Sequence, residues 1–105
     1  MDIIAEERIE VLHPDGDSRD VQLRIGRPRL SARSGDEWVC EVQANGLRIF
    51  EDPTELFGVG SLHTLMIGVE FLRRILAIEV ERGAILRWHG EADPIHLDEL
   101  FARTS

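Results

Sequence analysis

The sequence predicts an α+β domain in which a mostly antiparallel sheet of four to five strands carries one long helix on one face. Several short runs alternate apolar and polar residues, which is the period of a half-buried strand. One stretch, 62–82, instead repeats apolar residues at helical spacing. Glycine, proline, asparagine and aspartate separate these runs, and their order predicts ββββαβ with a short terminal helix.

The first two strands form a predicted hairpin over residues 3–13 and 19–27. The residues between them, 14–18, are turn formers, and Gly16 tolerates positive φ. In the second strand Val21, Leu23 and Ile25 alternate with polar residues, which places them on a buried face. Pro28 ends this strand because proline lacks an amide donor.

A second hairpin is predicted around Asn45-Gly46, because both positions of that pair tolerate positive φ. Residues 37–44 alternate and form the strand before it, and residues 47–50 form the strand after it. The segment from 51 to 60 is then expected to be a loop.

The long helix is predicted over 62–82, with Ser61 as its N-cap and Gly83 closing its C-terminus. Residues 85–89 are expected to form the last strand. Residues 91–94 form a turn, and 95–103 are expected to form a short terminal helix.

The predicted helix is apolar on two sides. One stripe spans its whole length and is expected to cover the sheet; it consists of Leu62, Leu65, Met66, Val69, Leu72, Leu76 and Val80. A second stripe lies nearly opposite and consists of Ile67, Phe71, Ile75 and Ile78. Leaving these four side chains in water forfeits about 1.5–3 kcal/mol each relative to burial.

Three ways of covering the second stripe remain open at this point. The loop 51–60 or the terminal residues Leu97, Leu100 and Phe101 could lie over it within the chain. A second copy of the chain could cover it, in the isologous arrangement usual for homodimers. A different protein could also cover it. The stripe is therefore the expected partner interface.

Composition narrows the classes of function. The 105 residues suffice for one domain, and 20 acidic against 12 basic residues give a formal charge of −8. A chain this acidic is a poor candidate for binding nucleic acid or anionic lipid. No apolar run is long enough to span a membrane and no signal pattern is visible, so we expect a cytoplasmic protein.

The residues give little indication of catalysis. Cys40, the single cysteine, lies mid-strand beside apolar neighbours and is expected to be a buried, inert thiol. His89 and His96 bracket two acidic residues, but their spacing matches no standard zinc pattern. Because no nucleophile, base and orienting group come together, we expect a non-enzymatic domain without metal or cofactor.

One basic cluster stands out in the acidic chain. Arg24, Arg27, Arg29 and Arg33 fall within ten residues, and all twelve basic residues of the chain are arginines. Guanidinium groups bind phosphates and carboxylates in a forked geometry. The cluster is therefore a candidate anion-binding site, unless neighbouring carboxylates such as Asp36 and Glu37 neutralise it.

Several segments resemble a family of small uncharacterised bacterial proteins. They are Ala5–Arg8, Val21–Arg29 with its Ile-Gly-Arg-Pro core, Glu37–Cys40 with tryptophan two residues before cysteine, Asn45–Leu47, and Phe57–Leu62 leading into the helix. The family has an acidic residue where Gly60 stands here. The resemblance implies a bacterial origin and a stand-alone domain, and it carries over no catalytic residue.

Together these features predict a domain that binds a protein partner, and in particular a second copy of itself. One specific version is an immunity-like inhibitor of a secreted toxin, because surplus carboxylates steer a small domain onto a basic surface. The alternative is a sensor of a small anionic ligand that uses the arginine cluster.

Overall fold

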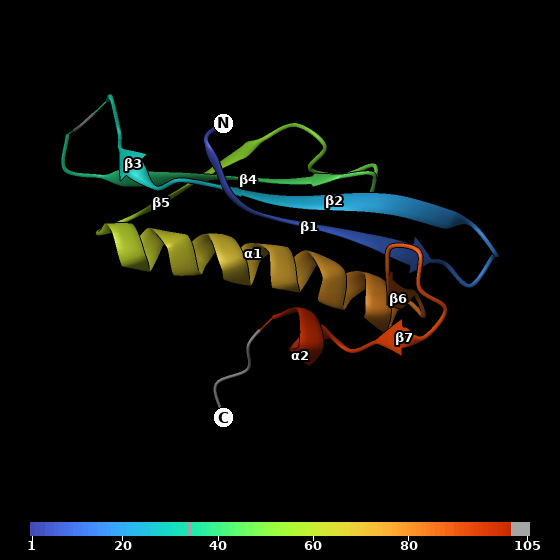
Figure 1. Ribbon diagram of the computed structural model, residues 1–105. Helices are drawn as coiled ribbons and strands as arrows, with labels where there is room; N and C mark the ends of the chain where they lie inside the picture. The colour runs from blue at the N-terminus through green and yellow to red at the C-terminus, as the bar shows by residue number, and fades with distance from the viewer. Residues whose placement is uncertain (34, 102–105) are drawn as a thin grey trace.

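The computed structural model describes residues 1–33 and 35–101 and confirms the α+β class. An antiparallel sheet of seven strands lies over one long helix, α1 (Figure 1). The elements in chain order are β1 (Ile3–Leu12), β2 (Ser18–Gly26), β3 (Arg29–Leu30), β4 (Trp38–Asn45), β5 (Thr54–Gly58), α1 (Ser61–Glu81), β6 (Ile85–Trp88), β7 (Pro94–Ile95) and α2 (Leu97–Leu100). The strand order is β3-β4-β2-β1-β6-β7, with β5 also paired to β4.

The predicted first hairpin is confirmed as the antiparallel pair β1 and β2. The alternating apolar residues of both strands face α1 and are buried in the core, among them Ile9, Val11, Val21 and Leu23. Alternation puts the polar residues of the same strands on the opposite face of the sheet. The sheet therefore has one apolar face under α1 and one charged outer face.

The predicted strand at 47–50 and the loop at 51–60 are wrong. Residues 47–50 form bends, in which Arg48 and Phe50 take positive φ, and the strand that pairs with β4 is β5. Asn45-Gly46 does not make a tight hairpin because the chain there passes directly beside β2. A Cβ on Gly46, at φ +111, would overlap the backbone oxygen of Asp20. Leu47 then turns inward and is buried in the core.

Helix α1 packs on the sheet through a different side from the one predicted. Its buried residues are Thr64, Gly68, Leu72, Ile75 and Leu76. Gly68 sets this orientation, since a Cβ there would lie 3.1 Å from Val42 Cγ1 and 3.2 Å from Cys40 Sγ. The helix is rolled by roughly a quarter turn from the predicted orientation, at 3.6 residues per turn.

The helix start also differs from the prediction. Gly60, not Ser61, is the N-cap residue. Thr64 donates its hydroxyl to the Gly60 carbonyl oxygen at 2.6 Å, and the Val59 backbone N–H donates to His63 Nδ1 at 3.2 Å. At the other end Gly83 takes φ +98 after the last turn, as expected for a helix terminator.

The C-terminal segment returns beside α1. The predicted last strand is present as β6, and the short β7 pairs with it. The predicted terminal helix is shorter than 95–103, because α2 ends at Leu100, and residues 102–105 lie outside the described residues. Phe101 is buried in the core beside α2. Within the described residues, no helix is both long and apolar enough to cross a membrane.

Candidate protein-binding surface

The side of α1 that faces away from the sheet carries large apolar side chains in solvent. Leu62 is 71% exposed, Met66 55% and Ile78 46%. A shallow depression of about 400 Å³ runs along this side and is lined by His63, Met66, Ile67, Glu70, Phe71 and Arg74. Exposed apolar residues grouped with charges in this way are typical of protein-interaction surfaces.

The four residues of the predicted interface stripe have different environments. Ile75 is only 5% exposed and belongs to the core, so the prediction for this residue is wrong. Phe71 is half-buried because the ring of Phe50 packs edge-on against it, with centroids 5.0 Å apart. Ile67 is also half-buried, whereas Ile78 is exposed. The bend at 47–50 thus covers Phe71, and the segment 51–60, predicted as a loop, packs against α1 as the strand β5.

Sequence reasoning missed Leu62 and Met66 as surface residues. It assigned both to the stripe that covers the sheet, together with Val80, which is 39% exposed. The roll of the helix about Gly68 turns all three outward. These three residues are identified as exposed only if Gly68 and Thr64 are placed on the side that faces the sheet. Neither Gly68 nor Thr64 is part of an apolar stripe, so hydrophobic periodicity does not place them there.

Three charged residues occupy the middle of the same surface. Glu70 accepts hydrogen bonds from Arg73 Nε at 3.0 Å and from Arg74 Nε at 3.3 Å. The bond from Arg73, and secondarily the one from Arg74, lowers the pKa of the Glu70 carboxyl. Glu70 is therefore ionised at neutral pH, and charges of both signs lie between the exposed apolar ends of α1.

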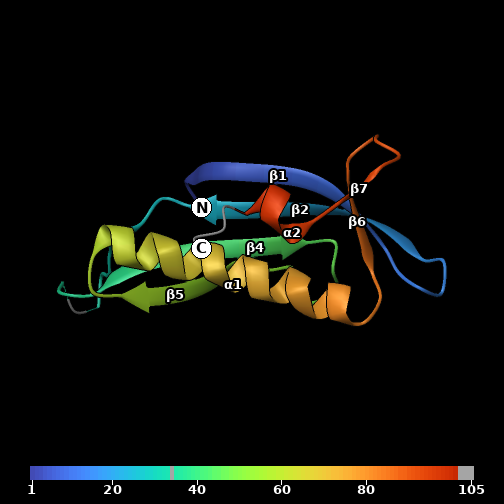
Figure 2. The ribbon, with the colours of Figure 1, turned by 90° about the horizontal axis from the view of Figure 1, so that it is seen from below.

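Two segments border this surface along its length. The bend that carries Phe50 lies on one flank, where it contacts Phe71. Helix α2 lies on the other flank, to one side of α1 in the view from below (Figure 2) and further from the sheet than α1 in Figure 1. The pKa of the Arg73 guanidinium is raised mainly by its hydrogen bonds to Glu70, and the charge of Asp98 on α2 adds to this rise. Leu97 and Leu100 pack against the core instead of covering the outward side of α1.

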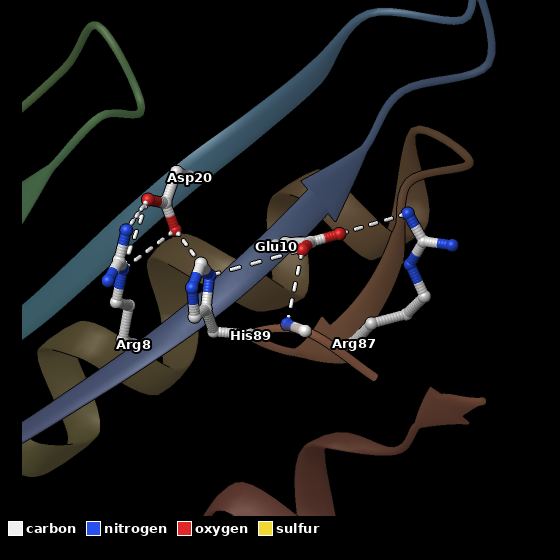
Figure 3. Close-up of polar contacts among 6 residues, drawn as sticks. Arg8, Glu10, Asp20, Arg87 and His89 are labelled. Atoms are coloured by element: carbon white, nitrogen blue, oxygen red, sulfur yellow. Dashed lines mark hydrogen bonds and ion pairs between the residues drawn. The ribbon is translucent and has the colours of Figure 1, made fainter. Parts of the chain in front are cut away.

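The outer face of the sheet is neutralised by cross-strand ion pairs (Figure 3). Arg8 donates from Nε to Asp20 at 3.0 Å, and His89 Nδ1 lies 3.3 Å from the same carboxylate. Glu10 accepts a hydrogen bond from Arg87 at 3.0 Å. The bond from Arg8 lowers the pKa of Asp20. These contacts tie β2, β1 and β6 together.

The four predicted anion-binding arginines do not form one site. Arg24 pairs with Glu6 at 3.0 Å and Arg27 with Asp2 at 2.8 Å, and both carboxylates are on the N-terminal segment. Arg29 lies 2.9 Å from Glu41 and 3.5 Å from Glu55. The carboxylates that neutralise these three arginines thus come from β1, β4, β5 and the residues just before β1.

Arg29 and Arg33 do line one pocket, of about 270 Å³, at the end of the sheet formed by β3, β4 and β5. Val39 and Phe57 contribute apolar surface to it, and Glu55 contributes a carboxylate. Arg33 donates its backbone N–H to Ser31 Oγ at 3.2 Å, which shapes the turn beside the pocket.

Cys40, His89 and His96, which the sequence offered as possible catalytic or metal-binding residues, are each held by contacts within the fold. Cys40 is buried, donates its thiol to the Gly26 carbonyl oxygen at 3.4 Å, and has a raised pKa because of burial. His96 is the N-cap residue of α2, whereas His89 lies beside Asp20 on the outer face of the sheet. The described residues contain no group of three or more His, Cys, Asp or Glu side chains arranged to hold a metal ion.

The unpaired part of the β1 edge is a second candidate surface, where a strand of another chain could pair with β1. Strand β6 pairs with β1 only over Ile9–Leu12, so among the described residues the edge of Ile3–Glu7 carries no neighbouring strand. A register shift between Ile3 and Ala5 distorts this edge, and Glu7 lies on the core-facing side opposite Leu23. Bulges and inward-facing charges are devices that discourage strand addition. The outward side of α1 is therefore the better binding surface.

Comparisons with known protein families, with curated proteins and with solved structures found no match to this chain.

Proposed function

We propose that this chain is a protein-binding domain that associates with a second copy of itself through the outward side of α1. The exposure of Leu62, Met66 and Ile78 on that side is the observation that carries the proposal. Full burial of such a side chain is worth about 1.5–3 kcal/mol, so covering the exposed half of each contributes roughly 1 kcal/mol. A homodimer counts every such contribution twice, because each copy offers the same surface.

Light scattering tests this proposal by measuring the absolute mass in solution from low-micromolar to millimolar concentration. We expect the wild-type chain to approach the mass of a dimer as concentration rises, and Met66→Glu to remain a monomer. Leu30→Glu is the matched control, because Leu30 is 52% exposed and lies on β3, away from α1. A wild-type chain that stays monomeric throughout would contradict the proposal.

A second candidate function is the binding of a small anionic ligand in the pocket that Arg29 and Arg33 line. Two guanidinium groups beside the apolar surface of Val39 and Phe57 suit a phosphate or carboxylate attached to an apolar group. A thermal-shift screen of phosphorylated metabolites and nucleotides tests it. Stabilisation that Arg29→Ala and Arg33→Ala both abolish supports this function, whereas Arg27→Ala, which lies outside the pocket, should leave the stabilisation unchanged.

The immunity-like role is a narrower proposal that rests on the formal charge of −8. An acidic surface raises the rate of association with a basic protein, and this contribution weakens as salt is added. Binding to a panel of basic nucleases at low and at physiological salt tests this role, and absence of binding at both contradicts it.

A further inference from the structure

We infer that the two copies pack α1 against α1 in antiparallel orientation, about a two-fold axis at the level of Leu72, and that Glu70 and Arg74 select the partner. This inference rests on the self-association proposed above and specifies its geometry. Three features of α1 favour it: the spacing of its outward residues, the match of their charges, and the exposure of Arg74.

The spacing of the outward residues reads the same in both directions along the helix. His63, Ile67, Glu70, Arg74, Ala77 and Glu81 follow one another at intervals of four, three, four, three and four. This alternation keeps a row of residues on one side of a helix, as in the seam of a coiled coil. Because the row is symmetric about position 72, a two-fold axis at that level superimposes it on itself in reverse.

The charged residues of the row are complementary in this arrangement. Residues equally distant from Leu72 lie at the same level in the two copies, so Glu70 meets Arg74 of the second copy. By the same symmetry His63 lies level with Glu81, and a histidine can donate a hydrogen bond to that carboxylate. Opposite charges placed across an interface fix its register.

The apolar residues in the row and at its edges stand level with one another. Ala77 and Ile78 of the second copy stand level with Met66 and Ile67, because each pair is five to six residues from position 72. Met66 and Ile78 are the exposed members of this group, and Ile67 is half-buried. Ile67 of each helix therefore stands beside Ala77 of the other on both sides of the charged centre, while Met66 and Ile78, about 120° apart around the helix, lie at the two edges of the contact.

Other arrangements of the same two helices oppose like charges. In a parallel pair in register, Glu70 lies against Glu70 and Arg74 against Arg74. An antiparallel pair moved by one helical turn in one direction again brings the two Glu70 side chains together, and a turn in the other direction does the same to Arg74. Like charges placed together across an interface are costly, so they exclude these registers.

The present contacts of Glu70 leave one arginine available to a second copy. Arg73 holds Glu70 through two nitrogens at 3.0 Å, while Arg74 contacts it through Nε alone at 3.3 Å. The Arg74 side chain is 76% exposed. Arg74 can therefore turn to Glu70 of the second copy while Arg73 retains its own bond, and symmetry forms this contact twice.

Helix α2 contacts α1 next to the symmetric row rather than on it. Figure 2 shows α2 to one side of α1, and Figure 1 shows that it also projects below α1, away from the sheet, so the second copy has to approach from the side of α1 opposite α2. Its neighbours on α1 lie on the flank of that helix: Leu100 lines a pocket with Val69 and Leu72, and Asp98 acts on Arg73. None of these three residues of α1 belongs to the symmetric row, although Arg73 lies directly next to it and bonds Glu70.

Charge reversal at Glu70 and Arg74 tests the geometry. Glu70→Arg places two arginines together across the interface and Arg74→Glu places two acids together, so each variant alone should dimerise at least about 10-fold more weakly than wild type. An equimolar mixture of the two variants restores opposite charges and should recover wild-type affinity as a heterodimer. The chain that carries both reversals should dimerise like wild type.

Two controls keep the outcomes distinct. Circular dichroism of each single variant checks folding, and recovery in the mixture shows independently that both variants fold. A wild-type dimer that neither single reversal weakens would overturn this geometry and leave self-association standing. Weakened single variants whose mixture does not recover would also overturn it. A monomeric wild-type chain would instead overturn the proposed function itself.

Discussion

Replacing Gly46 by alanine tests the connection between β4 and β5, where the sequence prediction fails. At φ +111 a side chain strains the backbone, which costs about 1–3 kcal/mol. The added Cβ also overlaps the Asp20 oxygen, and Asp20 is held in β2 by its pairing with Glu10 of β1. Because the backbone there cannot shift freely, overpacking adds about 1–3 kcal/mol. Gly46→Ala should therefore lose about 2–6 kcal/mol of unfolding free energy, the sum of the two contributions.

Gly16→Ala is the matched control, because Gly16 takes φ +91 in the β1–β2 turn with no described atom near its missing Cβ. It should lose only the backbone contribution, about 1–3 kcal/mol. Urea unfolding followed by circular dichroism measures both variants against wild type. Equal losses in the two variants would show that Gly46 does not lie against β2, and would refute the reasoning.

Three further predictions follow from the described contacts. Cys40 should react with a thiol reagent only at the rate of unfolding, because it is buried and its pKa is raised; fast labelling under native conditions would contradict its position under Gly68. The pKa of Asp20 is lower in the folded protein than in the unfolded chain, where it is about 3.9. Ionisation of Asp20 therefore stabilises the fold above the unfolded pKa, and this stabilisation is lost as pH falls through the pKa of the folded protein. Urea unfolding of Asp20→Asn should therefore show a weaker loss of stability between about pH 5 and 2 than wild type does, and an unchanged slope would contradict the ion pair with Arg8. Leu72→Ala should lose about 2–5 kcal/mol because Leu72 is 2% exposed and packs under the sheet, and a loss below about 1 kcal/mol would contradict that packing.

The fold was predictable where apolar and polar residues repeat at a regular spacing in the sequence. Alternation in β1 and β2 placed their buried residues correctly, and in β4 it identified Cys40 and Val42 but not Val39, which is 2% exposed; Gly83 marked the end of α1. The segment 47–58 was not predictable, because Asn45-Gly46 has the composition of a tight turn and nothing local shows that Gly46 must pass beside β2. A close approach between distant strands is a tertiary constraint that propensity does not encode.

The candidate surface on α1 was predictable only in outline. That α1 has more apolar surface than one sheet can cover followed from the sequence, and its exposed apolar residues agree with it. Which residues are exposed depended on the roll of the helix about Gly68 and Thr64, and neither of these is strongly hydrophobic. Hydrophobic periodicity depends mainly on the large apolar residues. It therefore placed Leu62 and Met66 against the sheet and Ile75 outside the core.

Distance measurement between spin labels tests the proposed pairing of α1 helices most directly. Labels are attached at Glu81→Cys in one sample and at His63→Cys in another, both of which are exposed positions, while the buried Cys40 stays unlabelled. Each label lies nine residues from Leu72, so a dimer about that axis separates the two copies by about 28 Å, with a rise of 1.5 Å per residue and helices about 8–10 Å apart. We expect the same distance from both samples. Unequal distances, a separation near about 10 Å as in a parallel pair, or no dipolar coupling at millimolar concentration would contradict the account.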